Sequence, residues 1–464
     1  MGYNRCMRAG VAEIPFDLPL GIPMMGYGAR KGVALSEHDP LHARALLLEN
    51  GGRVLFVQLE VCLLGVPQAA ALRARIARST GIPAEAIWIA ATHTHSGPET
   101  GLAQVLSGQP EPDHAEPIFA AAEEAAARAC ARAGPARIGL GAARAGIGRN
   151  RREAGGAVDE EIVVLRVDRA GSATGPAATG GTLAVAFVHG THPTVLGHEN
   201  LAWSADWPGA AGQEIRAAFP EAVPLFLLGA HGDVDPRTRG LQDLAIPDQS
   251  VGAGFEASDA LGREAGAAVV EAARAIVPDG ELAVASHATS VAIAVHGGEA
   301  GADARRRTLA RRAEEAARAL GLDPGEPLRI SRVFAAEADR IAGVAPEEAR
   351  ERLARGRLFV RDRTAPRIAG GLRPAVELRV LELGAARWLG LPAEVTAELG
   401  LAWKRAHAPG SAVLSNVGGW LRYLPHPDRF TSPLGHQHYE VLNSTLEPGA
   451  ALRLFSAAEA LAGR

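Results

Sequence analysis

Cysteine is scarce in this sequence of 464 residues, which contains only three. Cys6, Cys62 and Cys130 lie far apart, and none belongs to a Cys-x-x-Cys pair. A disulfide framework and a cysteine-rich zinc module are therefore not expected. We expect the three thiols to be reduced and structural.

Long apolar runs and concentrated basic segments are also missing. No stretch of about eighteen apolar residues occurs, so we expect no membrane-spanning helix. Residues 1–30 contain no apolar run typical of a signal peptide, which predicts a cytoplasmic protein. The formal charge is −4 and arginine is spread along the chain, so nucleic acid is not an expected partner.

The motifs of several common protein classes are absent as well. The sequence has no Gly-x-Ser-x-Gly nucleophile elbow, no Walker loop and no dinucleotide-binding fingerprint. Asp233 and Asp235 form an Asp-x-Asp pair, but the downstream glutamate of a calcium-binding EF-hand loop is missing. These absences argue against the commonest serine-hydrolase, nucleotide-binding and calcium-binding functions.

The composition and its patterning predict a folded α/β protein. Hydrophobic residues make up 47% of the chain and charged residues 22%, which is typical of a globular protein. Apolar strand-like runs alternate with helical periodicity, which predicts mixed β-sheets flanked by helices. The predicted strands are 43–48, 54–59, 87–91, 161–168, 182–189, 225–228, 281–296, 375–383 and 387–389. The predicted helices are 66–79, 117–133, 257–276, 395–407 and 449–462, with a helix-rich excursion at about 297–373.

A pair of histidines follows one of the predicted buried strands. His93 and His95 lie in Thr92-His93-Thr94-His95-Ser96-Gly97-Pro98, directly after the strand at 87–91. Side chains two residues apart on a strand point to the same face, so both imidazoles are expected to face one site. This suits two metal ligands, or one ligand and one reacting partner, although such pairs also occupy structural or solvent-facing positions.

Further histidines follow other predicted strands. His192 comes just after the strand at 182–189, but His189 and His198 are rival candidates, and spacing alone does not choose among the three. Two histidines and a carboxylate suit a catalytic zinc site, because such a site keeps one coordination position open. His231 follows a short strand, and a lone histidine there is more often structural.

Taken in order along the chain, these and other segments resemble the landmarks of the neutral ceramidase family, the neutral/alkaline non-lysosomal type. The matching segments are Gly26-Tyr27-Gly28-Ala29-Arg30, Asp39-Pro40-Leu41, the histidine motif at 92–98, Asn150-Arg151, His192-Pro193-Thr194, Ser204-Ala205-Asp206, Gly232-Asp233-Val234, Leu391-Pro392-Ala393-Glu394 and Tyr439-Glu440. The ordered set is specific, whereas any single segment is not. The resemblance implies the α/β catalytic fold of that family as a single domain over residues 1–464.

The resemblance also implies roles for individual residues. The implied ligands of a Zn²⁺ ion are His93, His192, Glu394 and Tyr423. This selects His192 over His189. The resemblance places His95 and Arg151 beside the metal, facing the substrate, and Tyr439 against the reacting carbonyl group.

The chain departs from the family pattern where ceramidases carry a serine implicated in catalysis. Their segment reads Gly-Asp-Val-Ser-Pro, whereas this chain has Gly232-Asp233-Val234-Asp235-Pro236. Asp235 cannot supply a hydroxyl nucleophile in the same way. The simpler scheme is a zinc-activated water, with His95 or a neighbouring carboxylate moving protons.

These features predict a zinc-dependent hydrolase that cleaves an amide bond in an N-acyl compound. The chain ends at Arg464, and we expect no C-terminal immunoglobulin-like domain of the kind that ceramidases carry. The expected partner is therefore a small N-acyl or lipid-like molecule, smaller or more soluble than ceramide. Two alternatives remain open: a metal-dependent lyase, cyclase or isomerase on the same scaffold, and a non-catalytic binding homologue.

Overall fold

The computed structural model describes residues 6–102, 112–171, 179–239, 252–280, 282–294, 375–431 and 439–461. The predicted helix-rich excursion at 297–373 lies outside these residues. Among the described helices, none combines the length and apolar character that a membrane crossing requires.

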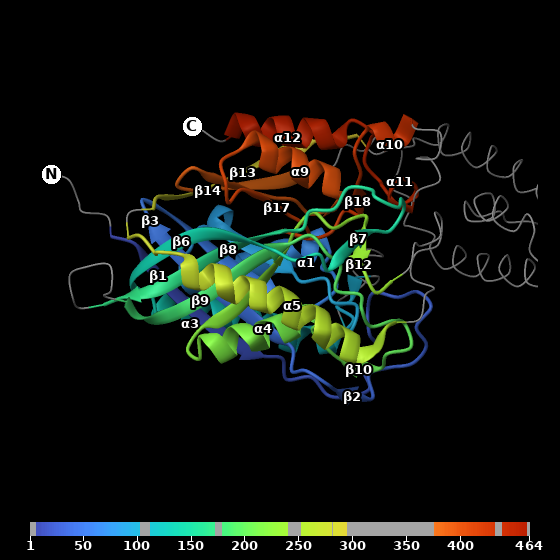
Figure 1. The fold of residues 1–464 in the computed structure, drawn as a ribbon, viewed down its shortest axis with the longest axis horizontal. Coiled ribbons are helices and arrows are strands. Elements are labelled where there is room, and N and C mark those ends of the chain that lie inside the picture. Colours follow the sequence, from blue (N-terminus) through green and yellow to red (C-terminus); the bar gives the residue numbers. More distant parts are fainter. Residues whose placement is uncertain are drawn as a thin grey trace, which may run out of the picture.

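An eight-stranded mixed sheet forms the centre of the fold (Figure 1), in the order β11-β9-β8-β6-β1-β3-β4-β5. Its strands are β1 (Arg8–Pro15), β3 (His42–Asn50), β4 (Gly52–Leu59), β5 (Ile87–Ala91), β6 (Gly134–Arg144), β8 (Glu161–Ala170), β9 (Thr179–His189) and β11 (Val223–Leu228). The pairs β4–β5 and β9–β11 are parallel, and the others are antiparallel. Strands β1 and β6 pair through only two residues of each strand, so the sheet divides into two halves there.

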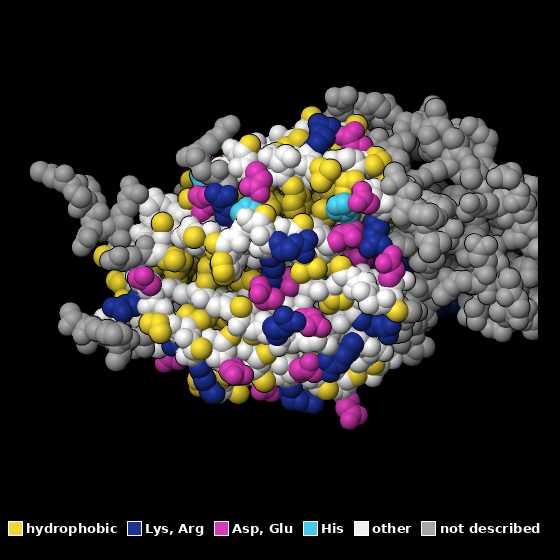
Figure 2. Space-filling model, turned by 45° about the horizontal axis from the view of Figure 1, so that its top comes forward, with side chains coloured by type: hydrophobic (Ala, Val, Ile, Leu, Met, Phe, Trp, Pro, Cys, Tyr) yellow, Lys and Arg dark blue, Asp and Glu magenta, His cyan; other side chains and the backbone are white. Residues whose placement is uncertain are grey.

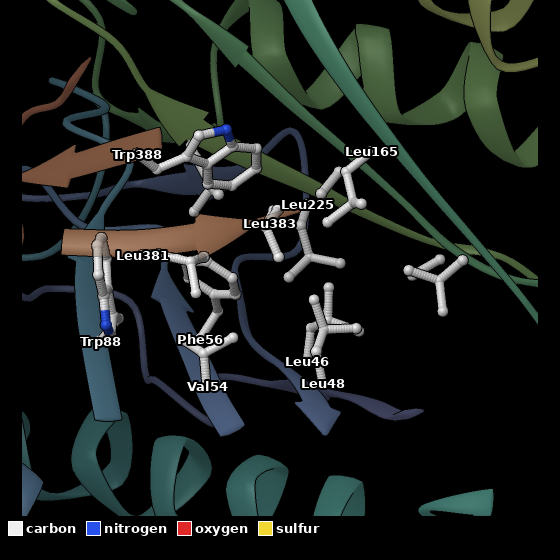
Figure 3. Close-up of a cluster of buried hydrophobic side chains, with 14 of the residues drawn as sticks. Leu46, Leu48, Val54, Phe56, Trp88, Leu165, Leu225, Leu381, Leu383 and Trp388 are labelled. Carbon is white, nitrogen blue, oxygen red and sulfur yellow. The ribbon is translucent and has the colours of Figure 1, made fainter. Parts of the chain in front are cut away.

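The two halves of this sheet face each other across an apolar core. Leu46 and Phe56 from one half and Leu165 and Leu225 from the other belong to one buried cluster (Figure 3). Burial of these side chains on both halves stabilises the fold through the hydrophobic effect. This central cluster lies between the halves, and further buried clusters lie between each half and its helices.

Helices cover the outer face of each half. On β4, Phe56 points into the central core, whereas Leu55 and Val57 belong to a second cluster with helices α1 (Val66–Thr80) and α3 (Glu116–Ala131). The helices of the other half are α4 (Trp207–Ala218) and α5 (Gly254–Ala275), which lie side by side (Figure 1). Because both faces of each half are covered, its strands read as nearly continuous apolar runs.

A four-stranded sheet, in the order β13-β14-β15-β17, adds a further layer. Its strands are β13 (Val284–Ala292), β14 (Ala375–Leu383), β15 (Ala386–Gly390) and β17 (Ala412–Leu414). Trp388 and Leu381 of this sheet reach into the central core (Figure 3), and its other face packs on α9 (Ala397–Ala406) and α12 (Ala450–Leu461). This layer brings the C-terminal part of the chain onto the N-terminal sheet.

Short elements beside these sheets carry four of the candidate site residues, Asp235, Glu394, Tyr423 and Tyr439. Within the described residues, the short strands pair as β2 (Ser36–Glu37) with β10 (Ala202–Trp203), β7 (Gly148–Asn150) with β12 (Val234–Pro236), and β16 (Glu394–Val395) with β18 (Tyr423–Leu424). The short α-helices are α10 (Asp428–Thr431) and α11 (Tyr439–Leu442). On the face drawn in Figure 2, acidic and basic side chains are interspersed among apolar ones.

The predicted fold class is confirmed, since mixed sheets are flanked by helices. The predicted helices agree with α1, α3, α5, α9 and α12 to within three residues at each end. Strands β1 and β6 were not predicted. Gly139 and Gly141 lie in β6, where a Cβ atom would be 2.4 and 2.7 Å from side-chain atoms of Ile276. Close packing of this kind requires glycine and so weakens the apolar pattern of a strand.

Candidate metal centre

The first histidine of the motif lies at a strained turn immediately after β5. The backbone N–H groups of Thr92 and His93 donate to the carbonyls of Leu59 and Val61, so the chain beyond β5 still follows the end of β4. His93 has a φ of 68°, in the left-handed region that few non-glycine residues adopt. Such strain persists where the surroundings fix it, and this turn directs the imidazole into the protein interior.

The next two histidines follow the parallel strands β9 and β11. Because these strands are parallel neighbours, their carboxyl ends meet at one edge, and the loops beyond them carry His192 and His231. The backbone N–H of His192 donates to the carbonyl of Val234 at 3.1 Å, and the indole N–H of Trp207 donates to the carbonyl of His192 at 3.2 Å. The parallel pair therefore places the two imidazoles together.

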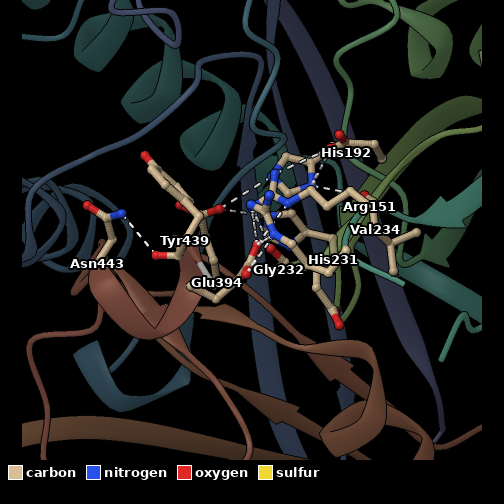
Figure 4. Close-up of polar contacts among 12 residues, drawn as sticks. Arg151, His192, His231, Gly232, Val234, Glu394, Tyr439 and Asn443 are labelled. Carbon is tan, nitrogen blue, oxygen red and sulfur yellow. Dashed lines mark hydrogen bonds and ion pairs between the residues drawn. The ribbon is translucent and has the colours of Figure 1, made fainter. Parts of the chain in front are cut away.

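A single carboxylate oxygen lies among the three imidazoles (Figure 4). Oε2 of Glu394 is 3.4 Å from Nε2 of His93, 3.4 Å from Nε2 of His192 and 3.5 Å from Nε2 of His231. All four side chains are buried. Their donor atoms form a group that could hold a metal ion.

Hydrogen bonds at the opposite ring nitrogens fix the tautomers of these histidines. Nδ1–H of His93 donates to the carbonyl of Cys62 at 2.9 Å, and Nδ1–H of His192 donates to that of Val234 at 2.9 Å. Nδ1–H of His231 donates to the carbonyl of Gly229 at 3.1 Å. A carbonyl only accepts, so each ring carries a proton on Nδ1 and its Nε2 atom faces the carboxylate. Metal-binding histidines have the same arrangement.

The electrostatics of the cluster follow from burial and from this mutual contact. Burial alone would raise the pKa of Glu394, but His93, His192 and His231 outweigh it and hold that pKa well below its usual value. Burial and then the charge of His192 lower the pKa of His231 to about 3. The carboxylate is therefore ionised and His231 neutral at pH 7. Burial alone would lower the pKa of His93, but Cys62 and Glu394 outweigh it and raise that pKa, so His93 would release its Nε2 proton on binding a metal.

The donor set fits a divalent cation. Nε2 of His231 and Oε2 of Glu394 are buried and make no hydrogen bond of good geometry with any described residue. Buried polar atoms are normally satisfied, because leaving one unpaired costs roughly 1–3 kcal/mol. Three nitrogen donors and one oxygen donor suit zinc and several neighbouring transition metals.

His95 lies beside this cluster as a second histidine of the motif. Its Nε2 is 3.3 Å from Nε2 of His93, and its ring meets the ring of Tyr27 edge-on at 4.7 Å. Burial and the nearby charges of His93 and His192 hold the pKa of His95 well below its usual value. A neutral His95 therefore faces the candidate metal position.

Arg151 links two carboxylates on the other side of the cluster. Its Nη1 donates to Oδ1 of Asp235 at 3.3 Å, its Nη2 to the carbonyl of Gly232 at 2.8 Å, and its Nε to Oε1 of Glu440 at 2.9 Å. Burial by itself would raise the pKa of Asp235, but Arg151 and His192 outweigh it and lower that pKa. Oδ1 of Asp235 lies 3.8 Å from Nδ1 of His192, so this carboxylate is a close neighbour of one histidine of the cluster.

The two tyrosines named by the resemblance lie next to Arg151. Tyr423 on β18 lies opposite Glu394 on β16 in a parallel strand pair. The ring of Tyr423 is 5.3 Å from the ring of Tyr439. Cζ of Arg151 lies 5.6 Å from the centre of the Tyr423 ring and 5.8 Å from that of Tyr439. All eight candidate residues therefore gather in one region, although they come from segments far apart in the sequence.

Several residues of this region were not predicted. The sequence only favours a structural role for His231 over a functional one. Its convergence with His192 depends on the parallel pairing of β9 with β11, which the sequence does not reveal. Glu440 accepts from Arg151 and also from Arg152, whose Nη2 is 2.8 Å away. The indole N–H of Trp420 donates to Oε1 of Glu394 at 2.8 Å. The rivals of His192 lie elsewhere: His189 packs on Trp207, and His198 lies 3.8 Å from Glu199.

Known proteins resemble this chain in structure rather than in sequence. No family model matches the sequence, and no curated protein matches it. Neutral ceramidase from Pseudomonas aeruginosa superposes with a TM-score of 0.66 at 18% identity, covering 99% of this chain and 74% of that one. A ceramidase complexed with C2 gives a TM-score of 0.66 at 19% identity, covering 99% of this chain and 75% of that one. The chain thus has the fold of neutral ceramidase, as the sequence resemblance implied.

Proposed function

We propose that this protein is a zinc-dependent hydrolase that cleaves the amide bond of an N-acyl compound. The observation that carries the proposal is the convergence of the Nε2 atoms of His93, His192 and His231 on Oε2 of Glu394, at 3.4 to 3.5 Å. The neutral ceramidase fold supports the same class, because a ceramidase hydrolyses an amide.

The metal-binding residues of the proposal are His93, His192 and Glu394, with Tyr423 as the further ligand that the resemblance implies. A divalent metal bound there supplies Lewis acidity toward a carbonyl group and lowers the pKa of a coordinated water. The Nδ1 hydrogen bonds of His93 and His192 to backbone carbonyls hold both rings in orientation before any substrate arrives.

The neighbouring side chains divide the remaining tasks. His95 is neutral at pH 7 and is the group that accepts a proton during attack on the carbonyl. Arg151 and Tyr439 are hydrogen-bond donors toward the carbonyl oxygen, where negative charge develops. Asp235 remains ionised, orients Arg151 and faces His192, and so acts as a charge partner rather than a nucleophile.

A cluster of apolar side chains beside His93 suits the acyl part of the substrate. Cys62, Leu63 and Leu102 form a buried cluster against which Met25 and Trp420 pack while remaining partly exposed. Partly exposed apolar surface next to polar reactive groups is typical of a ligand site. We therefore propose a small N-acyl or lipid-like substrate.

Metal analysis and product analysis test this function together. The purified protein should contain stoichiometric zinc and hydrolyse members of an N-acyl substrate panel, and in oxygen-18 water the released acid should carry the label. H93A and H192A should lose both metal and activity, whereas H198A should keep them. A wild-type protein without metal would contradict the zinc dependence, whereas products formed without the label would contradict hydrolysis and favour a lyase.

A further inference from the structure

We propose that Arg30 and Arg239 form a subsite beside His95 for a carboxylate group of the substrate. The amide that the protein cleaves would then be an N-acyl compound that carries a carboxylate, rather than an uncharged one. This inference rests on the proposed function, because it names the class of amide that the same site accepts.

Two guanidinium groups lie against one aromatic ring next to His95. Cζ of Arg30 is 5.0 Å from the centre of the Tyr27 ring, and Cζ of Arg239 is 5.3 Å from it. The Tyr27 ring in turn meets the ring of His95 edge-on at 4.7 Å. A single tyrosine ring is thus in contact with both cations and with the histidine that we propose as the proton acceptor.

The charge of Arg239 acts on the groups of the candidate site. Its backbone N–H donates to the carbonyl of Pro236 at 3.0 Å, and the residue is only 2% exposed, so water screens its charge little. Burial and the neighbouring histidines lower the pKa of His95, and Arg239 lowers it further. Burial alone would raise the pKa of Asp235, but Arg151 outweighs it and Arg239 acts in the same direction. Arg239 therefore adds positive potential to the space that a substrate would enter.

Backbone carbonyls hold the other cation and the ring in place. Nη1 of Arg30 donates to the carbonyl of Met25 at 3.1 Å, and Nη2 donates to that of Gly197 at 3.3 Å. The hydroxyl of Tyr27 donates to the carbonyl of Leu196 at 2.6 Å. These groups are ordered before a ligand arrives, so binding there costs little further conformational entropy.

Arg30 keeps a hydrogen-bond donor for a ligand. Its Nε is buried and makes no hydrogen bond of good geometry with any described residue. Burial lowers the pKa of Arg30, although Tyr27, Cys62 and Glu199 act against this. The side chain of Glu199 is 44% exposed, so water weakens its compensation of the buried cation. A substrate carboxylate would accept a hydrogen bond from Arg30 and compensate its charge as well.

The chemistry of the guanidinium group favours a carboxylate as the anion. Arginine binds a carboxylate through two parallel N–H groups while its plane stacks on an aromatic ring. Arg151 and Arg152, in contrast, share the carboxylate of Glu440, at 2.7 and 2.8 Å. We therefore assign the substrate carboxylate to Arg30 and Arg239, and Arg151 keeps its orientation toward the carbonyl group.

Matched substrates test this subsite in the full-length, metal-loaded protein. N-decanoylglycine and uncharged N-decanoylglycinamide differ in a carboxylate on the amine half, and N-octylsuccinamic acid and N-octylsuccinamide differ in one on the acyl half. The wild-type protein should have a lower KM for the charged member of at least one pair, and that pair identifies the half that carries the carboxylate. R30Q and R239Q should reduce this preference by about 10–100-fold, because each removes a charged hydrogen-bond donor.

Two further variants are the controls. R239K keeps the charge without the planar fork and should lose less of the preference than R239Q. R237Q should keep the wild-type preference, because Arg237 pairs with Glu264 at the surface.

The possible results separate this inference from the proposed function. Equal KM values for the charged and uncharged members of both pairs in the wild-type protein would overturn the inference. A loss in R30Q and R239Q that is the same for charged and uncharged substrates would also overturn it, because it would indicate a structural role. In both cases hydrolysis of the amides would still support the proposed function. A metal-loaded wild-type protein that hydrolyses none of the four amides would contradict the proposed function itself.

Discussion

Replacing Glu440 with glutamine should destabilise the protein by about 3 kcal/mol at neutral pH. Glu440 is buried in α11 and lies 2.7 Å from Nη2 of Arg151 and 2.8 Å from Nη2 of Arg152. Burial alone would raise the pKa of Glu440, but the two guanidinium groups outweigh it and lower the pKa from 4.5 to about 2. The carboxylate therefore balances two buried cations.

The magnitude follows from this shift in pKa. A difference of about 2.5 units, from 4.5 to about 2, corresponds to ~3 kcal/mol at 1.36 kcal/mol per unit. The value agrees with the roughly 3–5 kcal/mol lost when one partner of a buried ion pair is removed. At about 2.1 cal/mol/K per residue, unfolding 464 residues has an entropy near 1 kcal/mol/K. The melting temperature of E440Q should therefore fall by about 3 °C.

The pH dependence identifies the charge as the cause. Since the pKa of Glu440 is lower in the folded state, its contribution is present above the unfolded value of 4.5 and is lost as pH falls toward 2. Melting curves of wild type and E440Q should thus differ at pH 7 and converge below pH 4.5. E398Q is the matched control, because Glu398 pairs with Arg429 at a site where its side chain is 26% exposed. A difference below about 1 °C at pH 7, or one independent of pH, would refute the reasoning.

Two substitutions test the support around the metal position. G26A should lower kcat while metal content is kept, because its Cβ atom would lie 2.5 Å from Cγ of His95. G21A is the control, since Gly21 also has a positive φ, of 93°, but a Cβ atom there would have no contact within 4 Å with a described residue other than its chain neighbours. Equal activity in both variants would contradict a role for Gly26 in placing His95. W420F should lower zinc affinity by roughly 10–100-fold, because it removes the N–H that donates to Oε1 of Glu394. An unchanged affinity in chelator competition would show that this hydrogen bond does not orient the carboxylate.

The fold class could be predicted from sequence because the local hydrophobic pattern indicates strands and helices. Runs such as 54–59 are apolar on both faces, and the structure confirms that they are buried between the central core and a helix layer. The division of the sheet into facing halves could not be predicted, because it depends on a pairing between β1 and β6 of only two residues in each strand. The single domain over residues 1–464 and the excursion at 297–373 stay predictions.

The candidate site was predictable only where the chain keeps a recognisable order of motifs. A histidine pair after a strand predicted the position of His93, but no spacing rule separated His192 from His189. The structure brings His192 into the cluster and leaves His189, the last residue of β9, packed on Trp207. The roles of His231 and Glu440 in the site could not be predicted, because their partners are distant in sequence and only tertiary pairing brings them together.

The position of Asp235 suits the proposed hydrolase, which needs no side-chain hydroxyl group at this position. Arg151 donates to Asp235, to the carbonyl of Gly232 and to Glu440, so three segments of the chain fix one guanidinium group. A serine would offer Arg151 an acceptor without charge, whereas an ionised Asp235 holds the cation and faces His192 at 3.8 Å. A carboxylate that is buried and already paired is a poor nucleophile. Its position favours orientation of Arg151 toward a carbonyl oxygen, where a fixed positive group stabilises developing negative charge.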